Sequence, residues 1–280
     1  MNTKEIFSNG TRNLIRAIAV MFVLAFAACL DGSGGNSGSY AMVRVPGGSF
    51  QMGTASGGDS DERPVHTVTL SAFSIGKYEV TQALYQSVMG NNPSSGDGVG
   101  NDYPVYNVSW YDALEFCNKL SETEGLTPYY TINKTTNPWL VTRDIFVSGY
   151  RLPTEAQWEY AAKGGNGSPE NYTYAGSNYP DEVAWYVGNS GNTTHAVGRK
   201  VPNGLGIYDM SGNVYEWCWD WYDSYSSEAQ IDPEGASSGS YCVVRGGYWG
   251  DSAGDVRSAN RISHNPDYRD NTVGFRLVRP

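Results

Sequence analysis

Two carboxylates lie close together in the chain, and the residues between them could complete a cation site. Asp209 and Glu216 supply side-chain oxygens, and Gly212 and Val214 can supply backbone carbonyls. Oxygen ligands within so short a segment suit a hard cation such as calcium. The same pattern also fits two solvated acids beside a turn. The residue types alone leave both interpretations open.

The other residue types that carry chemistry do not gather in the sequence. His66, His195 and His264 are far apart, and no CxxC pair or Cys/His cluster stands at metal-binding spacing. No Ser-His-Asp order, phosphate loop or paired-carboxylate motif stands out. We therefore expect the three histidines to be ordinary surface or core residues.

Several remaining candidates have simpler structural interpretations. Cys117 lies in a helical apolar pattern and is expected to be packed. Cys218 and Cys242 could form a disulfide, which the sequence does not decide. Glu155 stands at a helix start, where its negative charge interacts favourably with the helix dipole. Arg151 is expected to pair with an internal acid.

The last segment, residues 245–280, consists of two interleaved sets of residues. The first set, the frame, has the character of a fixed scaffold: Arg245-Gly246-Gly247, Trp249, Arg257-Ser258-Ala259-Asn260-Arg261, Pro266-Asp267, Arg269 and Val273-Gly274-Phe275-Arg276. The second set, the gap residues, follows no helical or strand period and shares no chemistry. The gap residues are Tyr248, Gly250, Asp251, Ser252, Gly254, Asp255, Val256, Ile262, Ser263, His264, Tyr268, Asp270 and Thr272. A scaffold that holds chemically arbitrary positions predicts a ligand-binding face rather than a reaction centre.

The physical chemistry of the gap residues agrees with binding. Tyrosine, serine, glycine, aspartate and histidine supply contact area and adaptable hydrogen bonds at modest entropic cost, as they do in antibody loops. A fixed backbone limits the ordering cost of association. Trp249 belongs to the frame and is expected to pack into the domain.

The N-terminus predicts export and a lipid anchor. Basic residues precede an apolar run, Ala17–Ala28, that is too short to span a bilayer. Small residues directly before Cys29 resemble a bacterial lipoprotein signal, with residues 1–28 removed and lipid attached to the Cys29 thiol. Residues 29–40 are rich in Gly and Ser and predict a flexible tether. An ordinary signal peptide with an incidental cysteine is the alternative.

Composition sets the class of protein and excludes one class of partner. The chain has 280 residues, 40% of them hydrophobic, with 8 Trp and 21 Tyr, which is ample for a core. Its 34 Gly predict many turns rather than long helices. The net charge of −10 argues against a nucleic-acid partner, because phosphates would be repelled.

The patterns predict short elements joined by long loops. Strands are expected in 42–53 and 66–80, helices at 81–90, 109–125 and 154–164, few regular elements in 165–203, and strands in 206–223, 241–249 and 273–279. The strand in 206–223 alternates aromatic and polar residues, which predicts one buried face.

Five ordered motifs resemble the formylglycine-generating-enzyme (sulfatase-modifying factor) family. They are Val45-Pro46-Gly47-Gly48-Ser49-Phe50-Gln51-Met52-Gly53, Glu79-Val80-Thr81, Arg151-Leu152-Pro153-Thr154-Glu155-Ala156-Gln157-Trp158-Glu159-Tyr160-Ala161, Gly212-Asn213-Val214-Tyr215-Glu216-Trp217, and Arg245-Gly246-Gly247 followed by Gly274-Phe275-Arg276. The resemblance covers nearly all of residues 42–280. It implies a domain over 41–280 with a C-type-lectin-like fold, which is an irregular, loop-rich α+β fold with few helices and short antiparallel strands.

The resemblance does not imply the family's oxidase activity. Oxidase members use two cysteines shortly after the Arg-Gly-Gly strand, because thiolates bind copper(I) tightly. Residues 248–256 contain no cysteine, and Asp251 stands near the first expected position. The iron-dependent sulfoxide synthases of the family need a His-rich domain that this chain lacks. We therefore expect no catalysis, copper or iron, with an oxidase or nonheme iron enzyme as the alternative.

A narrower resemblance explains the interleaved segment. The frame and gap pattern is similar to variable proteins diversified by retroelements, such as Treponema variable protein A, a lipoprotein with this fold. There, template adenines are randomised, and every gap residue type is reachable from an AAC codon. This implies a surface-displayed, lipid-anchored envelope protein whose ligand is a protein or glycan on another cell or surface. A non-catalytic member with an ordinary loop, or an envelope spacer, are the alternatives.

The family resemblance also bears on the cation site. Asp209, Gly212, Val214 and Glu216 match one calcium site of the family, in which Asn commonly stands at the Asp209 position, so structural calcium is favoured. A second family site expects Asn near Val183, and we do not predict that site.

Overall fold

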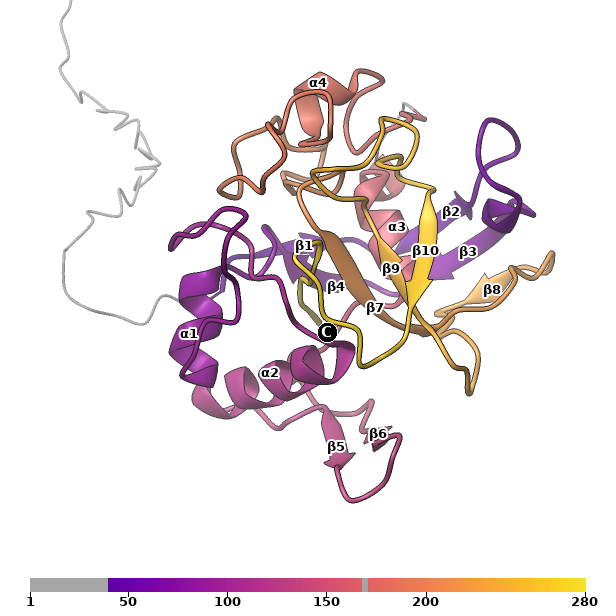
Figure 1. The fold of residues 1–280 in the computed structure, drawn as a ribbon. Helices are drawn as coiled ribbons and strands as arrows, with labels where there is room; N and C mark the ends of the chain where they lie inside the picture. Colours follow the sequence, from indigo (N-terminus) through magenta and orange to yellow (C-terminus); the bar gives the residue numbers. More distant parts are fainter. Residues whose placement is uncertain (1–39, 168–170) are drawn as a thin grey trace, which may run out of the picture. The chain divides into compact units, whose positions relative to one another are not determined.

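The structure is a computed structural model that describes residues 40–167 and 171–280 (Figure 1). The strands are β1 Met42–Val45, β2 Gly48–Met52, β3 His66–Leu70, β4 Phe73–Gly76, β5 Tyr130–Asn133, β6 Leu140–Arg143, β7 Tyr215–Trp221, β8 Gln230–Ile231, β9 Cys242–Arg245, β10 Arg261–His264, β11 Val273–Gly274 and β12 Val278–Arg279. The helices are α1 Gln82–Met89, α2 Trp110–Thr123, α3 Glu155–Ala162 and α4 Pro180–Val183, with the 3-10 turns η1 Ser60–Glu62 and η2 Gly165–Gly167. Few helices, short strands and long loops make an α+β fold, as predicted.

The predicted signal and lipid attachment site lie outside the described residues. This applies to residues 1–28, to Cys29 and to the tether up to residue 39. Tyr40, which the sequence assigned to the tether, is buried, and its hydroxyl donates a hydrogen bond to the Tyr78 carbonyl. The packed domain therefore already includes Tyr40. None of the helices in 40–167 and 171–280 is long and apolar enough to cross a membrane.

The largest sheet carries the C-terminal segment. Its strand order is β10-β9-β7-β11, in which β9 is antiparallel to both β10 and β7, and β11 is parallel to β7. Figure 1 shows β7, β9 and β10 side by side, with β10 at the edge. Two three-stranded sheets, β1-β4-β12 and β2-β3-β8, and the pair β5-β6 make up the other described sheets.

Reciprocal caps begin the two helices that pack against these sheets most closely. Ser109 and Asp112 form a capping box at the start of α2, and Thr154 and Gln157 form another at the start of α3. Each box satisfies backbone N–H groups that the first helical turn leaves free. The second box fixes Glu155 as the first residue of α3.

The central sheet has apolar cores on both of its faces. Trp217 and Val244 pack into one buried cluster, whereas Cys218 and Val243 pack into the other. Side chains alternate along a strand, so neighbouring residues of β7 and β9 reach opposite cores. The prediction of one buried face for this strand is therefore wrong, because the first four residues of β7 are all buried.

Several short elements were not predicted from the sequence. The strands β5, β6, β8 and β10 have no strong alternation, and β8 is only two residues long. β10 lies among the gap residues, where no strand period is visible. In the long segment 165–203, the described residues 165–167 and 171–203 form only η2 and α4 as regular elements, as predicted.

A buried ion network joins α3 to the end of β9 and the start of β10. Arg245 donates to Glu155 and to Glu159, each at 2.7 Å, and Arg261 donates to Glu155 at 2.7 Å. Lys163 reaches Glu159 at 2.7 Å. Burial alone would raise the pKa of both glutamates. The guanidinium of Arg261, with Arg245, holds the pKa of Glu155 below its usual value, and Lys163 with Arg245 holds that of Glu159 at about 2.

Arg151 does not join this network. The expectation that it pairs with an internal acid is wrong, because its Nη1 donates to the amide oxygen of Gln157 at 2.8 Å and to the Leu152 carbonyl at 3.0 Å. Arg151 thus supports the cap of α3.

Replacing Arg245 by alanine should strongly destabilise the fold. The change leaves two buried carboxylates without their shared guanidinium, and breaking a buried pair costs about 3–5 kcal/mol. Arg269→Ala is the matched control, because Arg269 is exposed and pairs with Asp112 at the surface, where such pairs contribute ~0–1 kcal/mol. Urea unfolding at pH 7 measures both free energies of unfolding. Equal losses in the two variants would contradict the structural role of the network.

Candidate functional site

Two glycines directly after β9 begin the segment of frame and gap residues. Gly246 and Gly247 have φ angles of 96° and 75°, a region that favours glycine. A Cβ at Gly247 would lie 2.6 Å from Cγ1 of Val256. The glycine pair therefore allows the left-handed backbone conformation and lets Val256 pack directly against Gly247.

Frame and gap residues differ in burial. The frame is buried in the runs 245–247 and 258–261, although some of its residues, such as Arg269, are exposed. Twelve of the thirteen gap residues are half-buried or exposed. Val256 is the exception: its side chain is fully buried and packs in a cluster with Tyr174. Val256 is therefore a core residue and cannot offer its side chain to a ligand, contrary to the prediction.

Aromatic gap residues gather on one side of the central sheet. His264 and Tyr268 stack with ring centroids 4.1 Å apart and ring planes 18° apart. The Tyr248 ring lies 5.6 Å from that of Tyr215, and His264 lies edge-on to Trp217 at 6.3 Å. The gap rings thus rest on aromatic side chains of β7.

Two polar gap residues border these rings. The Asp270 carboxylate lies beside Tyr268, and its negative charge also acts on Tyr248 and His264. Its Oδ1 accepts a hydrogen bond from the Thr272 backbone N–H at 3.2 Å. We call the surface made by Tyr248, His264, Tyr268, Asp270 and Thr272 the aromatic face.

A glycine-containing turn continues from the aromatic face. Asp251 Oδ2 accepts from the Tyr248 N–H at 3.2 Å, and the Asp251 carbonyl accepts from the Val187 N–H at 2.9 Å. Ser252 Oγ lies 2.7 Å from Asp255 Oδ2 and donates to it. Partial burial raises the pKa of Asp251 to about 6. These local bonds give the turn a defined shape next to Tyr248.

Strand β10 divides its gap residues between two sides. Ile262 and His264 share one side because side chains alternate along a strand. Ser263 lies on the other side with Arg261, opposite Val243 of β9. The structure therefore brings Ile262 to the border of the aromatic face but does not bring Ser263 there.

Three neighbours of the gap residues were not among the predicted site residues. Tyr215 and Trp217 lie beneath the aromatic rings, and Val187 contacts the turn through its backbone. The alternating aromatic residues of β7 predicted a strand, but they did not predict which side chains would pack against it. Val187 lies in the irregular segment 165–203, where the sequence carries no positional signal.

The described cysteines do not form a copper site. Cys117, Cys218 and Cys242 are buried and unpaired, so the disulfide that the sequence left open is not formed. Burial raises the pKa of all three thiols. Because the thiolate is the nucleophile and metal ligand, these cysteines are unsuited to redox chemistry.

The predicted cation ligands lie in a buried, polar part of the domain. Asp209 is buried with a φ of 57°; its Oδ2 accepts from the Gly198 N–H at 2.7 Å, and its Oδ1 has no hydrogen-bond partner. Glu216 is fully engaged, because Arg276 donates to both of its oxygens at 2.6 Å and Trp158 donates to Oε2 at 2.7 Å. Asp209 could therefore hold a cation, but Glu216 as placed could not.

Burial disfavours the ionised forms of the carboxyl groups in this region. Burial, then the charges of Asp209 and Glu216, raise the pKa of Glu79 well above its usual value. Burial raises the pKa of Asp209 to about 6. The side chains thus do not fit calcium as they are arranged, and in the described part of the chain no group of three or more His, Cys, Asp or Glu side chains could hold a metal ion. Calcium at Asp209, Gly212, Val214 and Glu216 stays a prediction.

Comparison with known proteins identifies the family. The sulfatase-modifying factor enzyme 1-like domain matches residues 35–280. This chain belongs to that family. The chaperone protein LppX of Paenibacillus barcinonensis is 46% identical over 233 residues, which cover 73% of this chain and 80% of that protein. The formylglycine-generating enzyme of Streptomyces coelicolor is 29% identical over 313 residues, which cover 85% of this chain and 88% of the enzyme.

A solved structure resembles the domain closely. Treponema denticola variable protein 1 has a TM-score of 0.77 and 39% sequence identity, and the match covers 85% of this chain and 95% of that one. The match confirms the predicted resemblance to variable proteins and the C-type-lectin-like α+β fold of the sulfatase-modifying factor family.

Replacing Asp209 by asparagine should flatten the pH dependence of stability. The folded pKa of about 6 lies above the usual carboxyl value, so stability is full at low pH and is lost as the pH rises through 6. Asparagine keeps an acceptor for Gly198 and tolerates a positive φ. Melting temperatures between pH 4.5 and 8 should fall by several degrees in the natural protein and clearly less in Asp209→Asn. Parallel profiles would contradict the assignment.

Proposed function

We propose that this protein is a non-catalytic, lipid-anchored protein of the cell envelope that binds a protein or glycan ligand. The aromatic face and the adjoining turn at Asp251 make the contact. Lipid on Cys29 and the tether that follows would hold the domain at the outer surface. The proposal extends the family assignment to a ligand-binding role.

One observation carries the proposal: the C-terminal segment separates buried frame residues from surface gap residues. Arg245 and Arg261 are held by ion pairs with buried glutamates. Tyr248, Tyr268 and Asp270 are half-buried, and they form no ion pair with the described residues. A side chain at the surface of a rigid backbone can be exchanged at small cost in stability. It can therefore serve recognition without endangering the fold.

The relatives support the same role at a coarser level. One similar structure is named a variable protein and one similar sequence a chaperone protein. A variable protein would need a scaffold that tolerates many side chains on one face, which is the arrangement around β10. Adenine-directed variation would leave a near-copy of the last segment beside a reverse-transcriptase gene in the DNA.

The chemistry of the aromatic face fits both predicted ligand classes. Tyrosine and histidine rings offer flat apolar area with a polar edge, and Asp270 and Thr272 offer hydrogen-bonding groups beside them. Sugar rings stack on such aromatic surfaces, and protein interfaces are enriched in tyrosine at their centres. The face is shaped by His264 stacked on Tyr268 and by Tyr248 on Tyr215.

Removing two rings should weaken ligand binding strongly and leave the fold intact. Tyr248→Ala with Tyr268→Ala deletes the largest contacts of the aromatic face, so binding should weaken at least tenfold. Loss of the ring pairs should cost stability only ~0.5–1.5 kcal/mol each. Ligands would be selected on a glycan array and from a displayed peptide library, and their affinities measured by calorimetry.

The matched control is Tyr179→Ala, since Tyr179 is an exposed tyrosine outside the aromatic face. It should leave affinity within about twofold. A second comparison is Val256→Ala, which removes buried methyl groups and should cost roughly 0.5–3 kcal/mol. Unchanged ligand binding in the double tyrosine variant would refute the aromatic face as the contact.

Copper-dependent oxidation of a cysteine peptide should be absent. The purified full chain, loaded with copper(I), should give no formylglycine product above the protein-free background, because Cys117, Cys218 and Cys242 are buried and their thiols resist ionisation. Mass spectrometry of the peptide measures the product. Turnover that persists after Asp251→Ala would point to ligands elsewhere, and any turnover would favour an enzyme of this family over a binding protein.

A further inference from the structure

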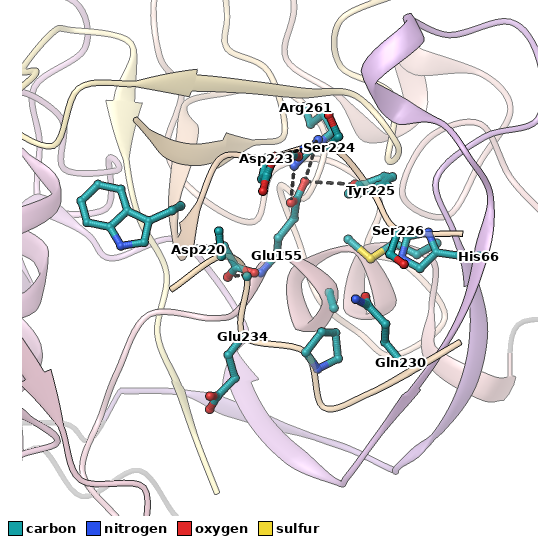
Figure 2. A pocket seen from close by; sticks show the side chains of 16 residues that line it. His66, Glu155, Asp220, Asp223, Ser224, Tyr225, Ser226, Gln230, Glu234 and Arg261 are labelled. Atoms are coloured by element: carbon teal, nitrogen blue, oxygen red, sulfur yellow. Dashed lines mark hydrogen bonds and ion pairs between the residues drawn. The ribbon is translucent and has the colours of Figure 1, made fainter. Parts of the chain in front are cut away.

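A separate cavity opens below the edge of β10, on the side of Arg261 (Figure 2). Its volume is about 340 Å³, which lies within the range of small-molecule sites. Figure 2 shows Glu155 and Asp220 in its centre, with His66 and Gln230 across the opening from Asp220. None of the five residues of the aromatic face lines this cavity.

The strong hydrogen-bond donors at this cavity are already used. Arg261 donates to both oxygens of Glu155 at 2.7 Å and to the Asp223 carbonyl at 2.8 Å. The Tyr225 hydroxyl donates to Glu155 Oε1 at 3.0 Å. Figure 2 shows both side chains directed at Glu155. A ligand would therefore find few free donors deep in the cavity.

Acceptors, by contrast, remain free. Asp220 is buried, and its Oδ2 accepts from the Glu155 N–H at 2.8 Å. Among the described residues, no hydrogen bond reaches its other oxygen, Oδ1. A Cβ at Gly235 would lie 2.9 Å from that oxygen, so the absence of a side chain at Gly235 leaves Oδ1 uncovered.

His66 adds a second acceptor. It is buried, and its Nδ1 lies 3.1 Å from the Pro64 carbonyl. A carbonyl only accepts, so Nδ1 carries the proton and the neutral ring leaves Nε2 as an acceptor. Within 40–167 and 171–280, Nε2 has no hydrogen-bond partner. The His66 ring is held 4.9 Å from that of Tyr225.

One part of the wall is apolar, whereas Asp223, Gln230 and Glu234 add polar and charged groups elsewhere in the lining. Met52, Ala156, Pro233 and Ala236 line the cavity beside these acceptors. A buried carboxylate without a cationic partner is costly, and Arg261 serves Glu155 rather than Asp220. The cavity thus combines free acceptors, an unmatched acid and aliphatic walls.

We propose that this cavity binds the ammonium group of a small aliphatic primary amine, with Asp220 as its carboxylate partner. An ammonium has three donors and no acceptor, which complements Asp220 Oδ1, while His66 Nε2 is a further acceptor across the opening. The alkyl stem lies along Met52, Ala156 and Pro233. The amine is either a free metabolite or the side chain of a lysine in a partner protein, since both present the same group.

Titration of Asp220 supports a pH-dependent affinity. Burial, and then the charge of Glu155, raises the pKa of Asp220 to about 7, while an alkylammonium keeps its charge up to about pH 10. The other charged or titratable groups at the cavity are Arg261, Asp223, Glu234, His66 and Tyr225. Affinity should therefore rise roughly tenfold between pH 6 and pH 8 as Asp220 loses its proton.

The test is calorimetric titration of the purified full chain with n-pentylamine and, separately, with the neutral isostere 1-pentanol. Pentylamine should bind and pentanol should not. Asp220→Asn should weaken pentylamine binding at least tenfold while keeping an acceptor for the Glu155 N–H. The matched control Asp144→Asn changes an exposed carboxylate outside the cavity and should change the affinity less than twofold.

A second variant covers the case in which Asp220→Asn folds poorly. Gly235→Ala places a methyl group over Asp220 Oδ1 and should also weaken binding, with the melting temperature reporting the strain at its φ of 74°. Titration with Nα-acetyl-lysine amide separates the two sources: binding points to a lysine of a partner, and its absence beside pentylamine binding points to a free amine. No pentylamine binding at pH 8, equal binding of pentanol, or full affinity in Asp220→Asn would overturn the proposal.

Discussion

The fold of the C-terminal segment depends on one buried guanidinium, that of Arg245. It lies between Glu155 and Glu159 of α3, and its Nη2 also donates to the Ser258 carbonyl at 2.7 Å. One side chain thereby ties the end of β9 to α3 and to the frame beyond the gap-containing turn. A charge of this kind is stable inside a protein only when every partner is in place, so the surrounding backbone has little freedom.

Rigidity at the frame and freedom at the surface follow from the same arrangement. Arg261 repeats the contact with Glu155 at the start of β10, so both ends of the stretch 246–260 are anchored on one acid. The surface gap residues between and beyond these anchors, unlike Gly247 and Val256, need only avoid clashes. This division accounts for a segment in which fixed and arbitrary residue types alternate without a helical or strand period.

Much of the fold could be predicted from local patterns, because capping boxes and glycine stops are local. The Thr154 and Gln157 pair located α3 correctly. Strand β10 could not be found, since its edge position and surface side chains remove the apolar alternation. Burial of Val256 also escaped prediction, because it depends on the close approach of Gly247 across the turn. The hydrogen-bond partner of Arg151 is Gln157, whose position is set by the cap of α3. The spacing of acidic residues in the sequence does not reveal this partner.

The aromatic face and the cavity at Asp220 lie on opposite sides of β10. His264 belongs to the aromatic face, whereas Arg261 lines the cavity. A single short strand thus separates the aromatic face from a cavity to which the frame contributes Arg261. Variation on one side would leave the other unchanged, because alternate side chains of a strand do not share neighbours.

The most direct measurement is a folding selection on a library in which residues 245–276 are substituted one position at a time. The account predicts that the twelve surface gap positions accept most residue types with melting temperatures close to the parent. Arg245, Gly247, Val256 and Arg261 should accept almost none. A tolerance profile that does not distinguish the surface gap positions from these four would contradict the central claim that a rigid frame carries interchangeable side chains.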